Sequence, residues 1–207
     1  MPESKIRRGL YAYDQKLFGS GYERRVGLPG GWPRKFLYVG RYVQEKGIDA
    51  LLGGYAKYRS RSTDPWPLTC CGMGAMGDAV RAAEGVTDLG FVQPESQPDV
   101  FAAHGVFVIA SRYEPWGVVL AEAAGSGLPV ICTESCGASV EIVRSYYNGL
   151  TVATDDADQL AAAFLWMDRN AARLPEMGLA ATALARAHGA DVWADKWETA
   201  MGELVED

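Results

Sequence analysis

Two glutamates, Glu114 and Glu122, lie with seven residues between them in the stretch SRYEPWGVVLAEAAGSGLPVI, which covers positions 111–131. The apolar run 106–110 before this stretch is typical of a buried parallel strand. Pro115 disfavours helical backbone at the preceding residue, so Glu114 is expected in a loop just past that strand. A helix then opens at positions 115–117, and its first amides have no partner inside the helix, which makes its start an anion site. The unit therefore presents two carboxylates and the free amides of Gly117, Val118 and Val119.

Two cations follow an earlier apolar run. Arg41 comes directly after positions 35–40, and Lys46 opens the next predicted helix. An arginine and a lysine beside a strand end can neutralise a diphosphate. Taken alone, such a pair more often means two surface charges, but beside the glutamate stretch it favours a diphosphate site.

The elements that position these residues alternate between short apolar runs and helical periods. Such alternation predicts an α/β fold with a Rossmann-like, doubly wound parallel sheet and right-handed crossovers. Ligands of such sheets bind at the carboxyl ends of the strands, near the switch point of the strand order. About six strands are expected, at positions 35–40, 67–71, 86–91, 106–110, 129–132 and 149–152. Further helices are expected at positions 44–58, 78–84, 99–103, 138–143, 157–167, 175–188 and 190–204.

The glutamate stretch resembles the E-x7-E element of GT-B-type retaining glycosyltransferases, especially the large glycosyltransferase family 4 (group 1). The match with the family's element includes both acids, the Pro-Trp-Gly and the Gly-Leu-Pro-Val, all at the same spacing. The similarity continues in FLYVGR at 36–41, in Lys46-Gly47, in DLGFV at 88–92 and in NGL at 148–150. It covers about three quarters of the chain and corresponds to the C-terminal, donor-binding half of such an enzyme, a half of the GT-B fold.

The resemblance implies a role for each polar group. Glu122 would accept both ribose hydroxyls, since a carboxylate is a bidentate acceptor for a vicinal diol. Glu114 would bind the donor sugar at the catalytic centre. Arg41, Lys46 and the amides at 117–119 would hold the diphosphate and its leaving charge as donors fixed in advance. The implied reaction is retaining transfer of a hexosyl group from a nucleotide-diphosphate sugar, such as a UDP or GDP sugar, to an unknown acceptor in carbohydrate biosynthesis.

Glycines at 72, 74 and 77 spell G-x-G-x-x-G after a strand, a pattern that also occurs in dinucleotide-binding proteins. That fingerprint should belong to the first strand-helix unit and be followed by a strand that ends in an acid. Here it follows the second strand, and Asp88 lies inside the predicted strand 86–91. We therefore expect no nicotinamide or flavin. The resemblance implies that Gly72 and Gly74 lie close to the nucleotide and that its base meets backbone at Phe91 and Val92.

Composition limits the remaining classes. The net charge of −6 predicts no general nucleic-acid surface, although a diphosphate needs only local positive charge. No histidine cluster indicates a metal, so neither a metal nor a cofactor is expected besides the donor. The four cysteines are expected to be buried thiols. No apolar run approaches the ~20 residues of a transmembrane segment, and the N-terminus has no signal-peptide core, so a cytoplasmic location is expected.

Domain organisation follows from the same resemblance. Residues 1–33 are expected to be a connector, residues 34–192 the nucleotide-sugar-binding domain, and residues 193–207 a helix that crosses back to an N-terminal acceptor domain. That domain would be missing from this chain, so transfer would need it as a partner. Any association with the periphery of a membrane would come through that domain.

Three other functions are open at this point. Two carboxylates can form a glycosidase pair, although nothing else here is typical of a hydrolase. The chain could also be a catalytically silent module that binds a sugar nucleotide or a partner. A third alternative is a GT-B relative that epimerises nucleotide sugars.

Overall fold

Six parallel strands form one sheet in the computed structural model, which describes residue 9 and residues 11–206. Their order is β3-β2-β1-β4-β5-β6. This is the doubly wound, Rossmann-like arrangement that the sequence predicts. The bounds are β1 (Phe36–Val39), β2 (Leu68–Cys71), β3 (Val86–Asp88), β4 (Val106–Ile109), β5 (Val130–Thr133) and β6 (Gly149–Val152).

Strand β1 is the switch point of the sheet. It pairs in parallel with β2 on one side and with β4 on the other, with Phe36 opposite both Leu68 and Val106. The chain adds strands outward from β1 first in one direction and then in the other. The loops that leave β1 and β4 therefore diverge at one end of the sheet, where such folds bind ligands.

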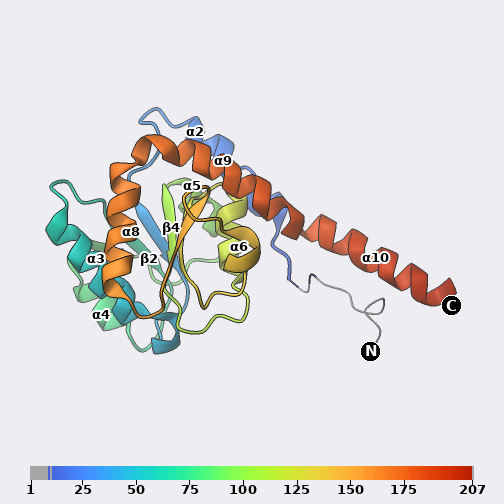
Figure 1. Cartoon of the computed structure of the whole chain (residues 1–207), viewed down its shortest axis with the longest axis horizontal. Coiled ribbons are helices and arrows are strands. Elements are labelled where there is room, and N and C mark those ends of the chain that lie inside the picture. The colour runs from blue at the N-terminus through green and yellow to red at the C-terminus, as the bar shows by residue number, and fades with distance from the viewer. Residues whose placement is uncertain (1–8, 10, 207) are drawn as a thin grey trace.

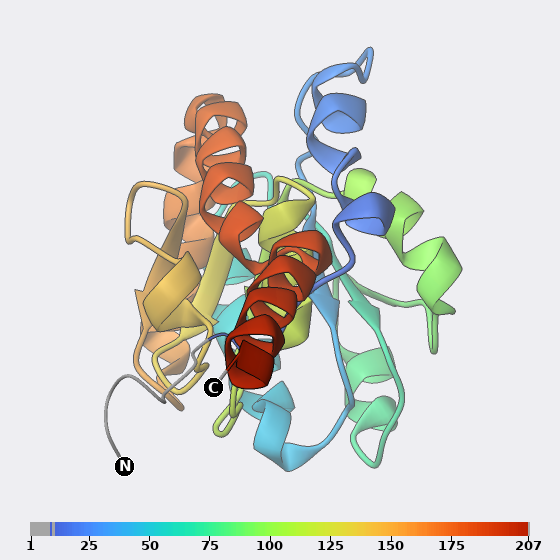
Figure 2. The ribbon, with the colours of Figure 1, turned by 90° about the vertical axis from the view of Figure 1, so that its right-hand side faces the viewer.

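Helices cover both faces of the sheet, as Figures 1 and 2 show. The helices are α1 (Gln15–Phe18), α2 (Gly21–Val26), α3 (Ile48–Arg61), α4 (Gly77–Ala82), α5 (Gln97–Ala102), α6 (Val118–Gly125), α7 (Ser139–Ile142), α8 (Ala157–Arg169), α9 (Leu174–Ala185) and α10 (Ala190–Glu206). Short 3-10 turns span Gln44–Lys46, Pro94–Ser96, Ala171–Arg173 and Arg186–His188. Helix α10 projects away from the body of the molecule (Figure 1).

Alternate residues of the strands face two separate cores. Phe36 and Tyr38 pack into a core with α3 and α8, while Leu37 between them packs into a second core with α5, α6 and α9. Strands β2, β4 and β5 are buried at every position. A strand covered on both faces has to be apolar throughout, which is why these segments are continuous apolar runs in the sequence.

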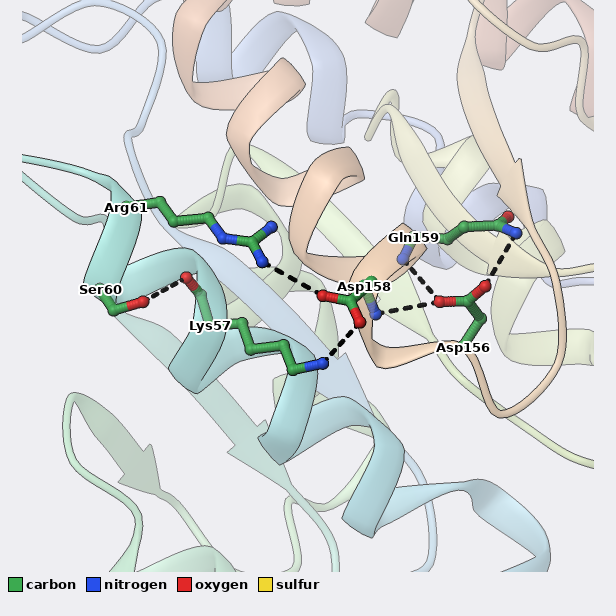
Figure 3. A network of polar contacts seen from close by, with 6 residues as sticks. All are labelled: Lys57, Ser60, Arg61, Asp156, Asp158 and Gln159. Atoms are coloured by element: carbon green, nitrogen blue, oxygen red, sulfur yellow. Dashed lines mark hydrogen bonds and ion pairs between the residues drawn. The ribbon is translucent and has the colours of Figure 1, made fainter.

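Helices α3 and α8 lie directly against each other on the first face. Gly54 allows this approach, because a Cβ atom there would lie 2.6 Å from the Cβ atom of Leu160. Figure 3 shows the polar contacts at the edge of this interface, where Lys57 and Arg61 of α3 form ion pairs with Asp158 at 2.7 and 3.1 Å. Asp156 caps α8 by accepting from the amides at 158 and 159. These contacts are exposed, so apolar packing supplies most of the stability of the interface.

The segment before β1 contains two helices, whereas the sequence predicts a connector of loop character there. Gly19 and Gly27 end α1 and α2, so these breakers mark helix ends. Arg25 of α2 is fully buried. Its guanidinium donates to four backbone oxygens, those of Phe101, His104, Ser126 and Gly127, at 2.6–3.1 Å.

Those four oxygens lie in the last turn of α5 or just past the C-terminal ends of α5 and α6, where the helix dipoles are negative. The buried charge of Arg25 is therefore stabilised by peptide groups and not by a carboxylate. Burial, with a smaller contribution from Arg24, lowers the pKa of Arg25 to about 9, so the side chain stays charged at neutral pH. This contact fixes the N-terminal segment to the second face of the sheet.

We predict that Arg25→Met lowers the free energy of unfolding by about 3 kcal/mol or more, because it removes a charged donor from four buried carbonyl groups, three of which have no other donor among the described residues. Urea unfolding monitored by circular dichroism measures this loss. The matched control is Arg24→Met. Arg24 forms an exposed ion pair with Asp99 at 2.7 Å, and such pairs contribute less than about 1 kcal/mol. Equal losses in the two variants would contradict this role of Arg25.

Candidate functional site

Two adjacent cavities open at the carboxyl end of the sheet, where β1 and β4 diverge. The first has a volume of about 310 Å³ and the second about 450 Å³. Val39, Gly40 and Gln97 line both, so the two cavities share a wall. The first is lined by Asp14, Leu17, Phe18, Tyr38, Val39, Gly40, Lys46, Pro94, Gln97, Ile109, Glu114, Val119 and Glu122. The second is lined by Val39, Gly40, Arg41, Cys71, Gly72, Met73, Phe91, Val92 and Gln97.

The residues predicted from the sequence divide between these cavities. The first is lined by Lys46, Glu114, Val119 and Glu122. The second is lined by Arg41, Gly72, Phe91 and Val92. Three predicted residues line neither: Gly74, Gly117 and Val118. The fold thus brings most of the predicted groups to one end of the sheet, although they are spread over more than eighty positions of the chain.

Lys46 and Glu114 form an ion pair in the first cavity. The Lys46 ammonium donates to the Glu114 carboxylate, and the two side chains are only 17% and 14% exposed. Glu114 lies in a loop after β4, as predicted, and its extended backbone forms a bridge with Cys136. The sequence predicts one cation for a diphosphate and one acid for a sugar, and the structure adds that the two neutralise each other.

Lys46 reaches this position through a turn that the sequence does not predict. The predicted helix 44–58 is divided by Gly47, which is left-handed with φ +63°. A Cβ atom at Gly47 would lie 1.9 Å from the carbonyl oxygen of Ala110. Lys46 therefore ends a 3-10 turn, and helix α3 begins after Gly47.

The side-chain carboxyl group of Glu122, in the middle of α6, has no hydrogen bond or ion pair with any residue that the structure describes. Burial, with a smaller contribution from the charge of Asp14, raises the pKa of Glu122 to about 7. A carboxylate in such a place loses hydration and gains no protein donor in return. Its lone pairs are available to a ligand that brings hydroxyl donors into the cavity.

The start of α6 supplies free amide donors next to Glu114. Gly117 caps the helix in a left-handed conformation, with φ +98°. A Cβ atom there would lie 2.8 Å from Cys136 Sγ and 3.1 Å from Glu114 Cγ. The amides of Gly117, Val118 and Val119 have no acceptor among the residues that the structure describes. The helix dipole adds partial positive charge at this end.

The second cavity offers flat apolar surface beside a free cation. Phe91 and Met73 are 56% and 62% exposed. Arg41 has no ion pair with any described residue. An exposed aromatic ring can stack on a planar ligand, and a nearby guanidinium can pair with an anion attached to that ligand.

Close backbone contacts explain why glycine is required at positions 72 and 74. Cβ atoms there would lie 1.9 Å from the Gly40 oxygen and 2.3 Å from the Tyr42 oxygen. The two loops are also joined by hydrogen bonds, with Tyr42 N donating to Met73 O at 2.8 Å and Met76 N to Tyr42 O at 2.9 Å. The glycine pattern thus fixes the loop that carries Arg41, and it does so without any dinucleotide.

One argument from the sequence about this pattern was wrong. Strand β3 ends at Asp88 and does not continue to Phe91, because Gly90 turns the chain with φ +64°. Asp88 is therefore at a strand end. However, its carboxylate already accepts from Tyr42 Oη and Gly90 N, both at 2.8 Å, and from Arg81 at 3.3 Å. These three donors occupy the oxygens that a ribose would need. In addition, the glycine pattern follows the second strand, whereas a dinucleotide fingerprint belongs to the first strand-helix unit.

Asp14, Tyr38 and Gln97 line the first cavity and were missed from the sequence. Asp14 is the N-cap of α1, where it accepts from Leu17 N at 3.0 Å. An aspartate directly before Gln-Lys-Leu-Phe is a recognisable helix start, which the surrounding glycines obscured. Gln97 donates to Val92 O at 3.4 Å and links the two cavities.

The histidine and cysteine side chains are held by packing and hydrogen bonds inside the protein. His104 is buried between Val100 O and Thr69 Oγ1, at 2.6 and 2.8 Å. His188 packs against the ring of Trp116. All four cysteines are free and buried, and burial raises their thiol pKa values. Within the described part of the chain, no three acidic, histidine or cysteine side chains gather as a metal would require.

Known proteins match both the sequence and the fold. The family described as Glycosyl transferases group 1 matches residues 33–170. An uncharacterized glycosyltransferase of Methanocaldococcus jannaschii is 31% identical over 157 residues, which cover 72% of this chain and 38% of that protein. The chain therefore spans well under half the length of this relative.

Solved structures share the fold. Sucrose-phosphate synthase of Thermosynechococcus elongatus superposes with a TM-score of 0.80 at 24% identity, covering 97% of this chain and 53% of that one. The pneumococcal O-GlcNAc transferase, in complex with UDP and GlcNAc, gives a TM-score of 0.72 at 21% identity, covering 84% and 36%. The neighbours are GT-B glycosyltransferases, so the sheet has the arrangement found in that fold.

We predict that Glu122→Gln stabilises the protein at pH 8 and has little effect at pH 4. The pKa of Glu122 is about 7 in the folded protein, against an ordinary value of 4.5. Between these values the folded state holds a proton that the unfolded state releases, so the wild type loses stability as the pH rises through this window. Across this window the wild type loses about 3 kcal/mol of its free energy of unfolding. Glutamine at position 122 carries no titrating group, so the variant avoids this loss.

Chemical denaturation of both proteins at pH 4 and pH 8 measures this difference. Glu176→Gln, an exposed change on α9, serves as the control and should be neutral at both pH values. A stability difference between Glu122→Gln and the wild type that is the same at pH 4 and pH 8 would contradict the raised pKa.

Proposed function

The chain belongs to the glycosyl transferases group 1 family, and from this premise we propose that it is the donor-binding half of a retaining glycosyltransferase. The reaction would move a hexosyl group from a nucleotide-diphosphate sugar to an acceptor. One observation carries this proposal: Glu122, largely buried and without a partner, shares a cavity with the Lys46–Glu114 pair at the switch point of the sheet.

The two cavities suggest how a donor would lie. Its base would stack on Phe91 in the second cavity and meet the backbone of Val92. Its ribose would place both hydroxyls on Glu122, past the shared wall. Arg41 and Lys46 would then be available to the diphosphate.

The Lys46–Glu114 pair would open when the donor binds. A diphosphate carries more negative charge than one carboxylate, so it can draw the Lys46 ammonium away from Glu114. Glu114 would then be free to accept hydroxyls of the transferred sugar. In the empty site the two groups neutralise each other, which keeps both of them in place at low cost.

The chemical step would depend on charges fixed before the reaction. As the bond from the sugar to the diphosphate breaks, negative charge grows on the leaving phosphate and positive charge on the sugar ring. Arg41, Lys46 and the amides of Gly117, Val118 and Val119 would stabilise the leaving group without reorganising. Glu114 would lie beside the ring of the transferred sugar and accept its hydroxyls. We propose that the chain needs no cofactor and no metal besides its donor substrate.

The acceptor half of the enzyme would be a separate domain. The relative from M. jannaschii is much longer than this chain, and the matched part is 38% of its length. Helix α10 projects from the body (Figure 1). Its side chains Trp193 and Met201 are apolar and exposed. We propose that this helix packs on an N-terminal acceptor domain and that the assembly works in the cytoplasm, in contact with a membrane only through that domain. No described helix is both long and apolar enough to cross a bilayer.

A solved structure with the same fold supports the donor class. The structure of the pneumococcal O-GlcNAc transferase contains UDP and GlcNAc. A donor with the same parts, a nucleoside diphosphate and a hexose, fits the joined cavities proposed here. The binding measurement below tests which base the donor of this chain carries.

We predict that the chain binds a nucleotide sugar and that Glu122→Ala weakens this binding about 10- to 100-fold, because hydrogen bonds to a charged group contribute about 1.5–3 kcal/mol. Isothermal titration calorimetry at pH 8 with UDP, GDP, ADP and their hexose derivatives measures the effect. The 2′-deoxy form of the tightest ligand should bind more weakly to the wild type. It should lose less affinity in Glu122→Ala than the ribose form does, because only its 3′-hydroxyl remains to contact Glu122.

The control is Glu176→Ala, which lies on α9 outside both cavities. Equal affinity of wild type and Glu122→Ala would remove the ribose assignment. Binding without transfer in the presence of any acceptor domain would favour a silent sugar-nucleotide module. Release of an epimer or free sugar without an acceptor would favour an epimerase.

A further inference from the structure

Asp14 places a second carboxylate in the proposed ribose site, and the following inference rests on the proposed function. Asp14 caps α1, and its Oδ1 accepts from Leu17 N at 3.0 Å. It lines the same cavity as Glu122, and α1 contacts α6 directly. The position of this carboxylate is therefore set by the start of a helix, whether or not a ligand is present.

These two acids have no cation of their own. Among the described residues that line the first cavity, Lys46 is the one with a positive charge, and it is paired with Glu114. Glu122 has no donor at all, whereas Asp14 has the Leu17 amide. When two carboxylates face one hollow, the one with fewer donors gains the proton. Here that is Glu122.

The other charged groups on elements that contact α6 either pair with other residues or lie outside the first cavity. The elements that contact α6 are α1, α7, α9, β4 and β5. On α1, Lys16 pairs with Asp191, and on α7, Glu141 lies near His188. Glu176 of α9 does not line the cavity, and the titratable group of β5 is the buried thiol of Cys132. Asp14 is thus the charge that acts most directly on Glu122.

We propose that Asp14 is a working part of the donor site: its carboxylate, fixed at the start of α1, lines the same cavity as the unpaired carboxyl group of Glu122 and adds to the effect of burial in favouring the protonated form, so that binding of a ribose diol expels a proton. The step is balanced as follows. The carboxylic acid of Glu122 gives its proton to the buffer, and the resulting carboxylate accepts hydrogen bonds from the two ribose hydroxyls. The diol keeps its protons, and no covalent bond to the ligand forms or breaks.

The size of the effect follows from the pKa of Glu122, which burial and then Asp14 raise to about 7. At pH 6.5 about three quarters of the empty molecules carry this proton, so binding should release about three quarters of a proton. Donor affinity should fall about tenfold for each pH unit below 7 and level off above it. Asp14 thereby gives the site a preference for donor at neutral to slightly alkaline pH.

The variant that isolates this role is Asp14→Asn. Asparagine caps helices as well as aspartate does, so α1 is retained while the charge is removed. The matched control is Asp156→Asn. Asp156 is also an N-cap, accepting from the amides at 158 and 159 at the start of α8, and it lines neither cavity.

The first arm of the test needs no ligand. Carbon-detected NMR of the glutamate carboxyl groups in the full chain follows the titration of Glu122, assigned by its absence in Glu122→Gln. We expect a midpoint near pH 7 in the wild type and in Asp156→Asn, and a clearly lower midpoint in Asp14→Asn. The midpoint of Asp14→Asn should stay above the ordinary glutamate value, because burial is unchanged.

The second arm measures the proton that binding releases. Calorimetry at pH 6.5 with UDP-glucose, GDP-mannose and ADP-glucose, each in two buffers of different ionisation enthalpy, gives the proton count for the donor that binds. The diphosphate of a nucleotide sugar does not itself titrate near neutrality. We expect about three quarters of a proton for the wild type, fewer for Asp14→Asn and none for Glu122→Gln. Asp14→Asn should also bind the donor more tightly than the wild type at pH 6, and the gain should shrink at pH 8.5.

The outcomes separate the two proposals. An unchanged Glu122 midpoint in Asp14→Asn overturns the role of Asp14, even if the donor binds as proposed. A proton count that persists in Glu122→Gln overturns it as well, because the proton then belongs to another group. A lowered midpoint in Asp14→Asn supports the electrostatic role of Asp14, and in that case binding of none of the three nucleotide sugars contradicts the proposed donor site alone.

Discussion

The approach of the loop after β1 to the end of β4 is the constraint on which the site depends. Gly47 lies so close to the Ala110 oxygen that only a glycine fits. The amides of Arg112 and Tyr113 both donate to Glu45 O, at 2.8 and 3.3 Å. The Arg112 guanidinium also holds Asp49 in a bidentate ion pair at 2.8 Å. These contacts bring Lys46 against Glu114 across the switch point.

This constraint explains why the candidate functional groups come from loops and helices while the strands carry none. The strands are buried on both faces and have no room for charge. At their carboxyl ends, the tight loop contacts fix backbone atoms well enough to hold a cation, an acid and free amides within one hollow. The N-terminal segment adds a further wall, and the buried Arg25 holds that segment to the ends of α5 and α6.

The site is costly for the folded protein. Glu122 is largely buried without a donor, and it shares its cavity with the fixed charge of Asp14. The amides at the start of α6 also have no partners. Such unsatisfied groups are destabilising unless something else occupies the cavity. The proposed donor would relieve both costs, because its hydroxyl groups would donate to the acid and its anionic oxygens would accept from the amides.

The sequence was sufficient to predict the sheet, because its strands are continuous apolar runs and the helices between them keep a regular period. It also drew attention to Glu114, Glu122, Lys46 and Arg41, which the structure places in the lining of the two cavities. The N-terminal helices were missed because they depend on distant contacts, such as those of Arg25 with carbonyl groups 76 to 102 positions away. For the same reason, the role of Asp14 could not be foreseen: it depends on how α1 packs on α6.

The most direct test of the account is a crystal structure of the chain with its tightest nucleotide sugar. The account predicts a ribose whose hydroxyls both contact the Glu122 carboxylate, and a Lys46 ammonium that has left Glu114 for the diphosphate. A nucleotide bound on another face of the molecule, with Lys46 still paired to Glu114 and Glu122 untouched, would contradict it.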